Sequence, residues 1–180
     1  MGESPGIDGL GTARLLLRPI TRDDVDLLVE IDRDPEVMRY LTGGKPSSRA
    51  DVEATIARSI GHRWIASERA AGDAVGWVAL RPTAPGEYEL GYRLLREYWG
   101  RGLATEAGRA LVAAAFDILD AQRVWAQTMA VNQRSRAVME RCGLRYVRTF
   151  HVDFDDPIPG TELGEVEYEL RRNAWTGPTG

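Results

Sequence analysis

Ten consecutive residues, from Trp99 to Gly108, have the composition of an anion-binding turn. They follow an alternating run that ends near Leu95 and precede an alanine-rich helical stretch, so a strand, a glycine-rich turn and a helix start come in succession. The first amides of a helix lack internal partners, and the helix dipole adds partial positive charge there. Gly100 and Gly102 let phosphates approach the main chain, and Arg101 adds a suitable cation. The order predicts a phosphate site, although a plain connector between a strand and a helix has the same composition.

Two better-known phosphate loops do not fit this turn. The P-loop ends in Gly-Lys-Ser/Thr, and the only lysine of the chain, Lys45, is far away in the sequence. The dinucleotide fingerprint needs a third glycine where Thr105 stands. The turn is therefore either a different kind of phosphate site or a plain connector between a strand and a helix.

The elements that must position the turn predict one α+β domain over residues 12–172. Alternating or short apolar runs predict about seven strands, near 15–17, 63–67, 74–80, 87–95, 124–129, 144–154 and 165–172. Helical spacing predicts about four helices, which begin near Thr21, Ser48, Leu103 and Asn132, with a break and a restart near Pro35. We expect the glycine-rich residues 1–11 to be disordered and residues 173–180 to be mobile.

Composition excludes several classes of function. The chain has 180 residues, 43% hydrophobic and 28% charged, with a net charge of −4, which argues against a general nucleic-acid binder. No apolar run reaches the length of a membrane span, and no signal peptide is evident, so we expect a cytoplasmic protein without a membrane partner. One cysteine and two histidines, Cys142, His62 and His151, give no zinc-binding spacing, so we expect no metal.

The order of elements and four motifs resemble the GNAT (GCN5-related) acetyltransferase superfamily. Its signature is Gln/Arg-x-x-Gly-x-Gly/Ala, whose last two fixed positions are filled here by Gly102 and Ala104, while Trp99 stands where Gln or Arg is usual. The run Tyr-Trp-Gly-Arg-Gly-Leu-Ala-Thr-Glu-Ala at 98–107 is similar to the ribosomal-protein N-terminal acetyltransferases of the RimJ/RimL branch. The stretches 14–19, 34–40 and 132–144 support the same branch, so the resemblance covers about residues 12–172.

The resemblance implies a mostly antiparallel twisted sheet, acetyl-CoA as cosubstrate and a reaction without a metal. It assigns the pyrophosphate to the main-chain amides of Gly100, Arg101, Gly102, Leu103, Ala104 and Thr105. It pairs the pantetheine arm with the main chain at Leu94 and Leu95, and adds a contact from Asn132. Asn132 can equally be the N-cap of its helix, and Arg101 can equally be a solvated turn residue. Homodimers are common in such folds.

The resemblance also suggests how acetyl transfer to an amine would run. Transfer needs a neutral amine and a protonated leaving thiolate. Glu89, six residues before Leu95, stands where several family members carry a glutamate base, although it can also be an exposed strand residue. Glu106 is a weaker candidate, since an acid in the first turn of a helix favours the dipole. Met139 occupies the usual position of the tyrosine acid, so Ser135 is the substitute donor, unless it is only a small packed residue.

The acceptor is an amine, either a protein N-terminus or a small molecule such as an antibiotic or a polyamine. Asp153 and Asp155 lie in an acidic loop that would attract a cationic amine, or that is only solvated. Tyr40, Trp64 and Tyr92 are candidate pocket residues, although each can also belong to the core. A non-catalytic acyl-CoA-binding module is the alternative from another class of function.

Overall fold

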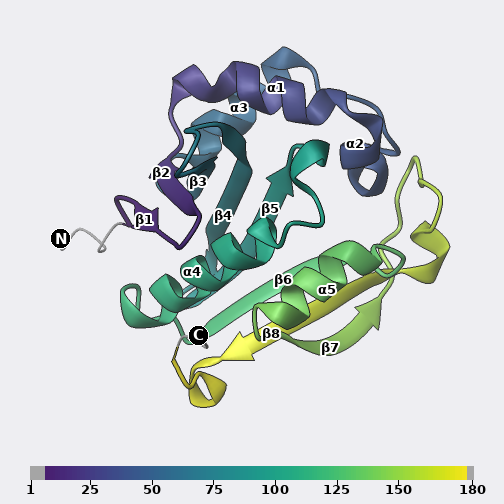
Figure 1. The fold of residues 1–180 in the computed structure, drawn as a ribbon. Coiled ribbons are helices and arrows are strands. Elements are labelled where there is room, and N and C mark those ends of the chain that lie inside the picture. Colours follow the sequence, from purple (N-terminus) through teal and green to yellow (C-terminus); the bar gives the residue numbers. More distant parts are fainter. Residues whose placement is uncertain (1–6, 178–180) are drawn as a thin grey trace.

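The computed structural model describes residues 7–177, which form one open, eight-stranded sheet flanked by helices on both faces (Figure 1). The strand order is β1-β2-β3-β4-β5-β6-β8-β7, and β5 and β6 are the one parallel pair among neighbours. The strands are β1 (Leu10–Gly11), β2 (Leu15–Pro19), β3 (Arg63–Glu68), β4 (Ala74–Ala84), β5 (Glu87–Leu94), β6 (Arg123–Met129), β7 (Arg145–Phe150) and β8 (Glu165–Arg171).

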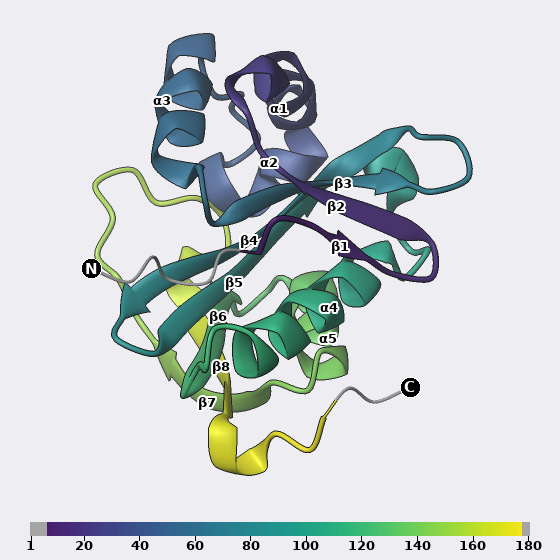
Figure 2. The ribbon, with the colours of Figure 1, turned by 90° about the vertical axis from the view of Figure 1, so that its left-hand side faces the viewer.

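Five helices form the two outer layers, as Figure 2 shows. One layer contains α1 (Val25–Arg33), α2 (Pro35–Thr42) and α3 (Arg49–Ser59), and the other contains α4 (Leu103–Asp117) and α5 (Gln133–Arg141). Local signals fix where these helices begin. Ser48 Oγ accepts the amide of Asp51 at 3.2 Å, and Asp34 accepts the amide of Glu36 at 2.9 Å with Pro35 in the first turn.

Two hydrophobic clusters fill the space between the sheet and its helices. The larger lies under α4 and α5 and contains Leu90 and Leu94 of β5. The smaller lies under α1 and α3 and contains Ile56, Ile65 and Trp77. Successive side chains of a strand point to opposite faces. Because Leu90 and Leu94 face α4 and α5, the adjacent residues Glu89 and Arg93 point toward the layer of α1–α3.

The N-terminal segment is more ordered than its composition suggested. Ile7 is buried, its carbonyl accepts the indole Nε1 of Trp64 at 3.0 Å, and Leu10–Gly11 pair with β2 as β1. The expectation of disorder over 1–11 is therefore wrong for residues 7–11, because tertiary contacts order a glycine-rich segment that lacks local propensity. Residues 1–6 lie outside the described residues.

The C-terminal segment also packs on the domain as far as it is described. Trp175 stacks on Phe116 of α4 with ring centroids 5.1 Å apart, and its Nε1 donates to Asp117 at 3.2 Å. Residues 173–177 were expected to be mobile, and in the structure Trp175 among them has these two contacts with α4; residues 178–180 lie outside the described part of the chain.

Three differences from the expected elements remain. The eighth strand is β1, which composition concealed. The fifth helix is α2, where the Asp34 cap and Pro35 start a full helix rather than a short restart. The strand expected over 144–154 ends at Phe150, and an irregular loop containing Asp153 and Asp155 follows it. None of the helices within 7–177 is both long and apolar enough to cross a membrane.

Candidate active site

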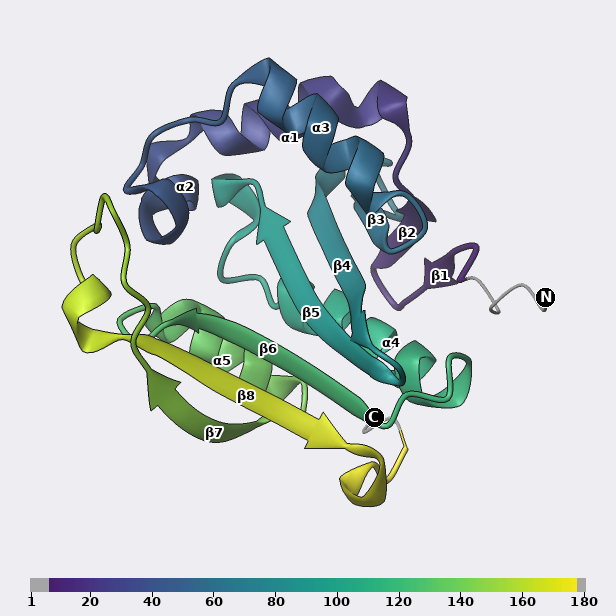
Figure 3. The same cartoon turned by 180° about the vertical axis from the view of Figure 1, so that it is seen from behind.

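The centre of the sheet opens where β5 and β6 part. These strands pair only from Glu87–Arg123 to Glu89–Trp125, after which β5 continues to Leu94 beside β4 and β6 continues to Met129 beside β8. Figure 3 shows the two strands diverging from this point. The main chain of β5 beyond Glu89 thus has an edge without a strand partner, to which an extended chain can bond.

The glycine-rich turn lies at the open end of β5 and has the geometry of an anion cradle. Gly100 and Gly102 adopt φ of +73° and +76°, and a Cβ at Gly100 would meet nothing within 4 Å. Within residues 7–177, the amides of residues 100–105 donate to no protein acceptor, whereas the amide of Glu106 bonds to Gly102 at 3.0 Å. Free amides at a helix start fit a pyrophosphate, so the turn is compatible with CoA.

Two aromatic and charged contacts hold the turn in place. The indole Nε1 of Trp99 donates to the carbonyl of Leu94 at 2.9 Å, which uses one of that carbonyl's two lone pairs. Arg101, half exposed, forms an ion pair with Glu68 and lies over the ring of Tyr98. The expected phosphate contact of Arg101 would therefore require its guanidinium to leave Glu68 or to use its other donors.

Glu106 ties the N-terminal loop to the first turn of α4. Its carboxylate accepts the hydroxyl of Thr12 at 2.5 Å, the amide of Arg14 at 2.7 Å and the guanidinium of Arg14 at 2.6 Å. Burial alone raises the pKa of Glu106, but these hydrogen bonds and the Arg14 charge outweigh burial and hold that pKa below its ordinary value. These contacts give Glu106 a structural role at the cradle.

Asn132, Ser135 and Tyr92 form a connected group between β5 and α5. Asn132 caps α5 by accepting the amide of Ser135 at 3.2 Å, and its Nδ2 donates to Thr128 at 3.0 Å. The hydroxyl of Tyr92 lies 3.0 Å from Ser135 Oγ and donates to the Ser135 carbonyl at 2.9 Å. Burial raises the pKa of Tyr92, more than the Ser135 hydrogen bond lowers it, so this hydroxyl stays neutral.

Glu89 lies in a cleft of about 600 Å³ on the α3 face of the sheet. Its carboxylate is mostly shielded from solvent, and Oε2 accepts Arg81 Nε at 2.9 Å. His62 lines the same cleft. Burial, followed by the charges of Arg63 and Arg81, lowers the pKa of His62 below its ordinary 6.5, so its imidazole is neutral near pH 7. The cleft therefore contains two groups that can accept a proton.

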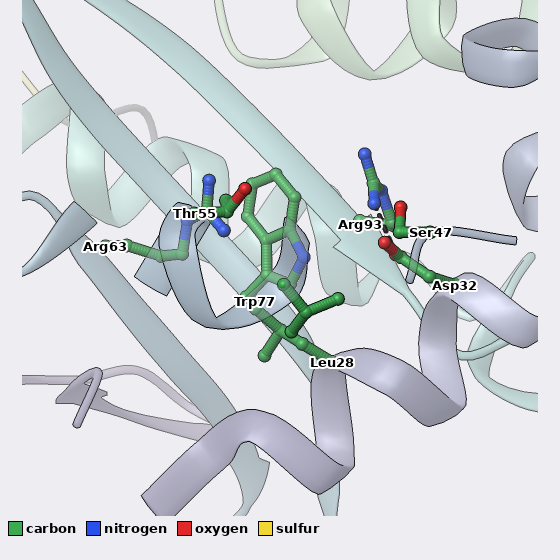
Figure 4. Close-up of a pocket in the computed structure, with 8 residues that line it drawn as sticks. Leu28, Asp32, Ser47, Thr55, Arg63, Trp77 and Arg93 are labelled. Atoms are coloured by element: carbon green, nitrogen blue, oxygen red, sulfur yellow. Dashed lines mark hydrogen bonds and ion pairs between the residues drawn. The ribbon is translucent and has the colours of Figure 1, made fainter. Parts of the chain in front are cut away.

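A second cavity of about 150 Å³ adjoins this cleft and shares Thr55, Arg63 and Trp77 with it. Figure 4 shows the Arg63 guanidinium on one side of the Trp77 indole and the Arg93–Asp32 ion pair on the other. The guanidinium carbon atoms lie 4.0 Å (Arg63) and 5.2 Å (Arg93) from the centroid of the Trp77 ring. The cavity is therefore lined by two positively charged guanidinium groups and one carboxylate, which gives it a net positive charge.

The expected acceptor residues are scattered. Trp64 is a core residue with 2% exposure and an occupied N–H, so its placement in a pocket is wrong. Tyr92 points toward α5, away from the α3-face cleft. Tyr40 is half-buried on α2 and lines neither cavity. Asp153 and Asp155 are exposed in the β7–β8 loop, which the Lys45–Asp156 ion pair of 2.9 Å joins to the chain after α2.

Sequence reasoning missed His62, Arg63, Trp77 and Arg93. They come from β3, β4, β5 and the turn before β3, and only the strand register brings them together. The alternation of Glu89 and Arg93 on one face of β5 was visible in the sequence, but nothing there showed that Trp77 faces the same way.

Comparison with known proteins agrees with this geometry. The sequence profile of the acetyltransferase (GNAT) domain matches residues 14–145. The chain therefore belongs to the GNAT acetyltransferase family, whose members transfer an acetyl group from acetyl-CoA. Among the described residues, no three His, Cys, Asp or Glu side chains gather as a metal site would require.

Individual relatives differ in their stated acceptors. The FsC-acetyl coenzyme A-N(2)-transacetylase of Aspergillus fumigatus is 36% identical over 92% of this chain and 77% of its own length. YdaF of Bacillus subtilis, a candidate ribosomal N-acetyltransferase, is 33% identical but matches only 49% of this chain and 48% of its own. A GNAT-family acetyltransferase of Bacillus anthracis has the same fold, with a TM-score of 0.78 and 23% identity over 92% of this chain and 99% of its own.

Proposed function

We propose that this chain transfers the acetyl group of acetyl-CoA to the primary amine of a small molecule. The observation that carries the proposal is the parting of β5 and β6 directly after Glu89, with a cradle of free amides at the open end of β5. The pyrophosphate would bind the amides of residues 100–105. The pantetheine arm would lie along the main chain at Leu94 and Leu95, and the Asn132 cap would face its far side.

Glu89 and His62 are the groups proposed to prepare the amine. The neutral amine attacks the thioester carbonyl, a C–N bond forms and the C–S bond breaks. The amine proton passes to Glu89, directly or through water, or to neutral His62. The thiolate takes a proton from Ser135 Oγ, which Tyr92 holds in place. Ser135 Oγ then recovers a proton from water, and Glu89 or His62 releases the amine proton to water, so the proton balance closes. An α-amine with a pKa of about 8 would need only a weak base near neutral pH.

The A. fumigatus relative supports a small-molecule acceptor. Its name specifies transfer to an N(2) position, and it matches this chain over nearly its whole length. The 600 Å³ cleft also falls within the size range of small-ligand sites, about 300–1,000 Å³. Acetylation of a protein N-terminus is the second candidate, which the partial match to YdaF favours.

The test follows free CoA with a thiol reagent while the protein and acetyl-CoA meet small amines, amino acids, short peptides and a ribosomal-protein N-terminal peptide. We expect release of free CoA with one or more of the small-molecule amines, and not only with the ribosomal-protein peptide. Release with the ribosomal peptide alone would support the second candidate. Binding of acetyl-CoA without release with any acceptor would contradict both and indicate a non-catalytic module.

A further inference from the structure

Arg63 is a partly buried cation that lies over the Trp77 indole but has no anionic partner among the described residues. Within the described part of the chain, its guanidinium enters no ion pair, and its buried Nε has no hydrogen-bond acceptor. Burial and the charge of Arg93, offset in part by Asp32, lower its pKa to about 10, so it remains charged near pH 7. A buried donor without an acceptor is costly, which points to a ligand that supplies an acceptor to this cation.

Trp77 adds a second unpaired donor to the same cavity. It is 8% exposed, and its Nε1 is buried and also lacks an acceptor within residues 7–177. Arg63 Nε and Trp77 Nε1 are thus two unsatisfied donors beside one cavity, with Arg93 on the other side of the indole. Guanidinium and indole N–H groups are donors only, so their common ligand must be an acceptor.

Strand register joins this cavity to Glu89. Trp77 pairs with Arg93, Ala79 with Gly91, and Arg81 with Glu89, so these residues form a row on one face of β4 and β5. The middle of the row has only small side chains, and a Cβ at Gly91 would meet its nearest neighbour at 3.6 Å. From Glu89 to Arg93 the row measures about 14 Å.

The charge of the whole row favours an anion. The two cavities are lined by Arg58, Arg63, Arg81 and Arg93 against Asp32 and Glu89, in a chain whose net charge is −4. Since Glu89 pairs with Arg81 and Asp32 with Arg93, Arg58 and Arg63 are left without an acidic partner in the described chain, and of these two only Arg63 lines both cavities. The small cavity, about 150 Å³, suits a carboxylate rather than a whole ligand.

We propose that the acceptor is an amine that also carries a carboxylate, which binds to Arg63 and Trp77 while the amine lies beside Glu89. This inference rests on the proposed function, because it assigns the acceptor of the same transfer. The planar guanidinium suits a planar carboxylate, and Arg93 adds a second positive charge nearby. A site that binds a carboxylate in this way would bind polyamines poorly, because polyamines carry only positive charges.

The experiment uses glycine peptides, which differ only in length and terminal charge. Diglycine, triglycine and tetraglycine, and their C-terminal amides, span about 7–14 Å from amine to carboxyl. Each is titrated by calorimetry into the CoA-bound protein, and transfer is followed separately as free CoA. We expect at least one acid to bind about tenfold more tightly than its amide.

Variants assign this preference to the cavity. Trp77→Phe keeps an aromatic ring but removes the N–H, and Arg63→Met removes the charge; we expect each to reduce the acid-to-amide ratio toward one without changing CoA binding. Arg49→Gln removes an exposed arginine of α3 outside both cavities and should leave the ratio unchanged. Gly91→Val, which fills the row, should weaken acids and amides alike.

Several outcomes would overturn the inference. These are equal binding of acids and amides, no binding of any acid, tighter binding of spermidine than of every acid, or a preference that survives both cavity variants. Competition by inorganic phosphate that is stronger than competition by acetate would reassign the cavity to a phosphate and reject the carboxylate. Carboxylate binding without release of CoA from acetyl-CoA would instead count against the proposed function alone.

Discussion

The hydroxyl of Tyr92 lies 3.0 Å from Ser135 Oγ, and together they connect the middle of β5 to the first turn of α5. Because Tyr92 also donates to the Ser135 carbonyl, its oxygen can accept the proton of Ser135 Oγ when no ligand is bound. The serine proton thus has a definite resting partner close to the point where the strands part.

Ser135→Ala should slow transfer. The variant lacks the proposed donor to the thiolate, so we expect kcat to fall about a hundredfold while the Kd for acetyl-CoA changes little. Steady-state kinetics and calorimetry measure the two quantities. Ser67→Ala, a serine of β3 outside the site, is the matched control. Unchanged kcat in Ser135→Ala would remove Ser135 from the proton path.

Glu89→Gln and His62→Gln should distinguish the two candidate bases. If Glu89 accepts the proton, its variant loses about a hundredfold in kcat, and the His62 variant loses much less. Glu30→Gln, an exposed acid of α1, controls for loss of a negative charge. The reverse ranking in the acceptor assay would transfer the role to His62.

The lowered pKa of His62 predicts how stability changes with pH. In the unfolded chain this histidine binds a proton near pH 6.5, whereas in the folded protein it does so only at lower pH. Its contribution is therefore complete above about pH 6.5 and is lost as pH falls through the folded pKa. Urea unfolding from pH 7 to pH 5 should show a shallower loss of stability for His62→Gln than for the parent protein. Parallel pH profiles would contradict the assignment.

Gly100→Ala should weaken acetyl-CoA binding by more than it weakens the fold. A Cβ at a φ of +73° costs about 1 kcal/mol, and it would also add a methyl group to the turn on which the pyrophosphate is proposed to bind. Gly72→Ala is a matched control, since Gly72 has a φ of +80° and equally open surroundings in the β3–β4 turn. Thermal unfolding should show similar losses for both, and calorimetry should show a raised Kd for acetyl-CoA in Gly100→Ala only.

Glu106→Gln should destabilise the N-terminal loop in a pH-dependent way. The lowered pKa means that the carboxylate contributes stability above its unfolded pKa of about 4.3, and that this contribution is lost as pH falls. We expect a loss of about 1 kcal/mol near pH 7 and a smaller difference from the parent protein below about pH 4. A difference that stays constant with pH would point to packing rather than charge.

The region around the turn could be predicted from sequence because its signals are local. Alternation over 87–94, glycines at 100 and 102, and the apolar spacing of α4 each depend on neighbours in the chain. The GNAT family followed from the same stretch. The cap at Asn132 and the contact of Ser135 with that cap were also accessible, since both lie within one helical turn.

The acceptor side could not be predicted because it depends on register between strands. Trp64 and Trp77 both lie in apolar strands, but Trp64 pairs with Val78 while Trp77 pairs with Ile65, which places the two indoles on opposite faces of the sheet. Only the observed pairing shows that Trp77 joins Arg63 and Arg93. The order of residues 7–11 was hidden for a similar reason, since a distant indole binds the carbonyl of Ile7.

The limited pairing of β5 with β6 has a consequence for folding. Only Glu87 to Glu89 of β5 pair with β6, so few main-chain contacts join the two halves of the sheet. Much of the contact between the halves therefore comes from α4 and the hydrophobic cluster beneath it. A cosubstrate lying along the free edge would behave as a removable strand and couple ligand occupancy to cooperative unfolding. At a free concentration of acetyl-CoA a hundred times its Kd, mass action alone would add about 2.7 kcal/mol to the free energy of unfolding.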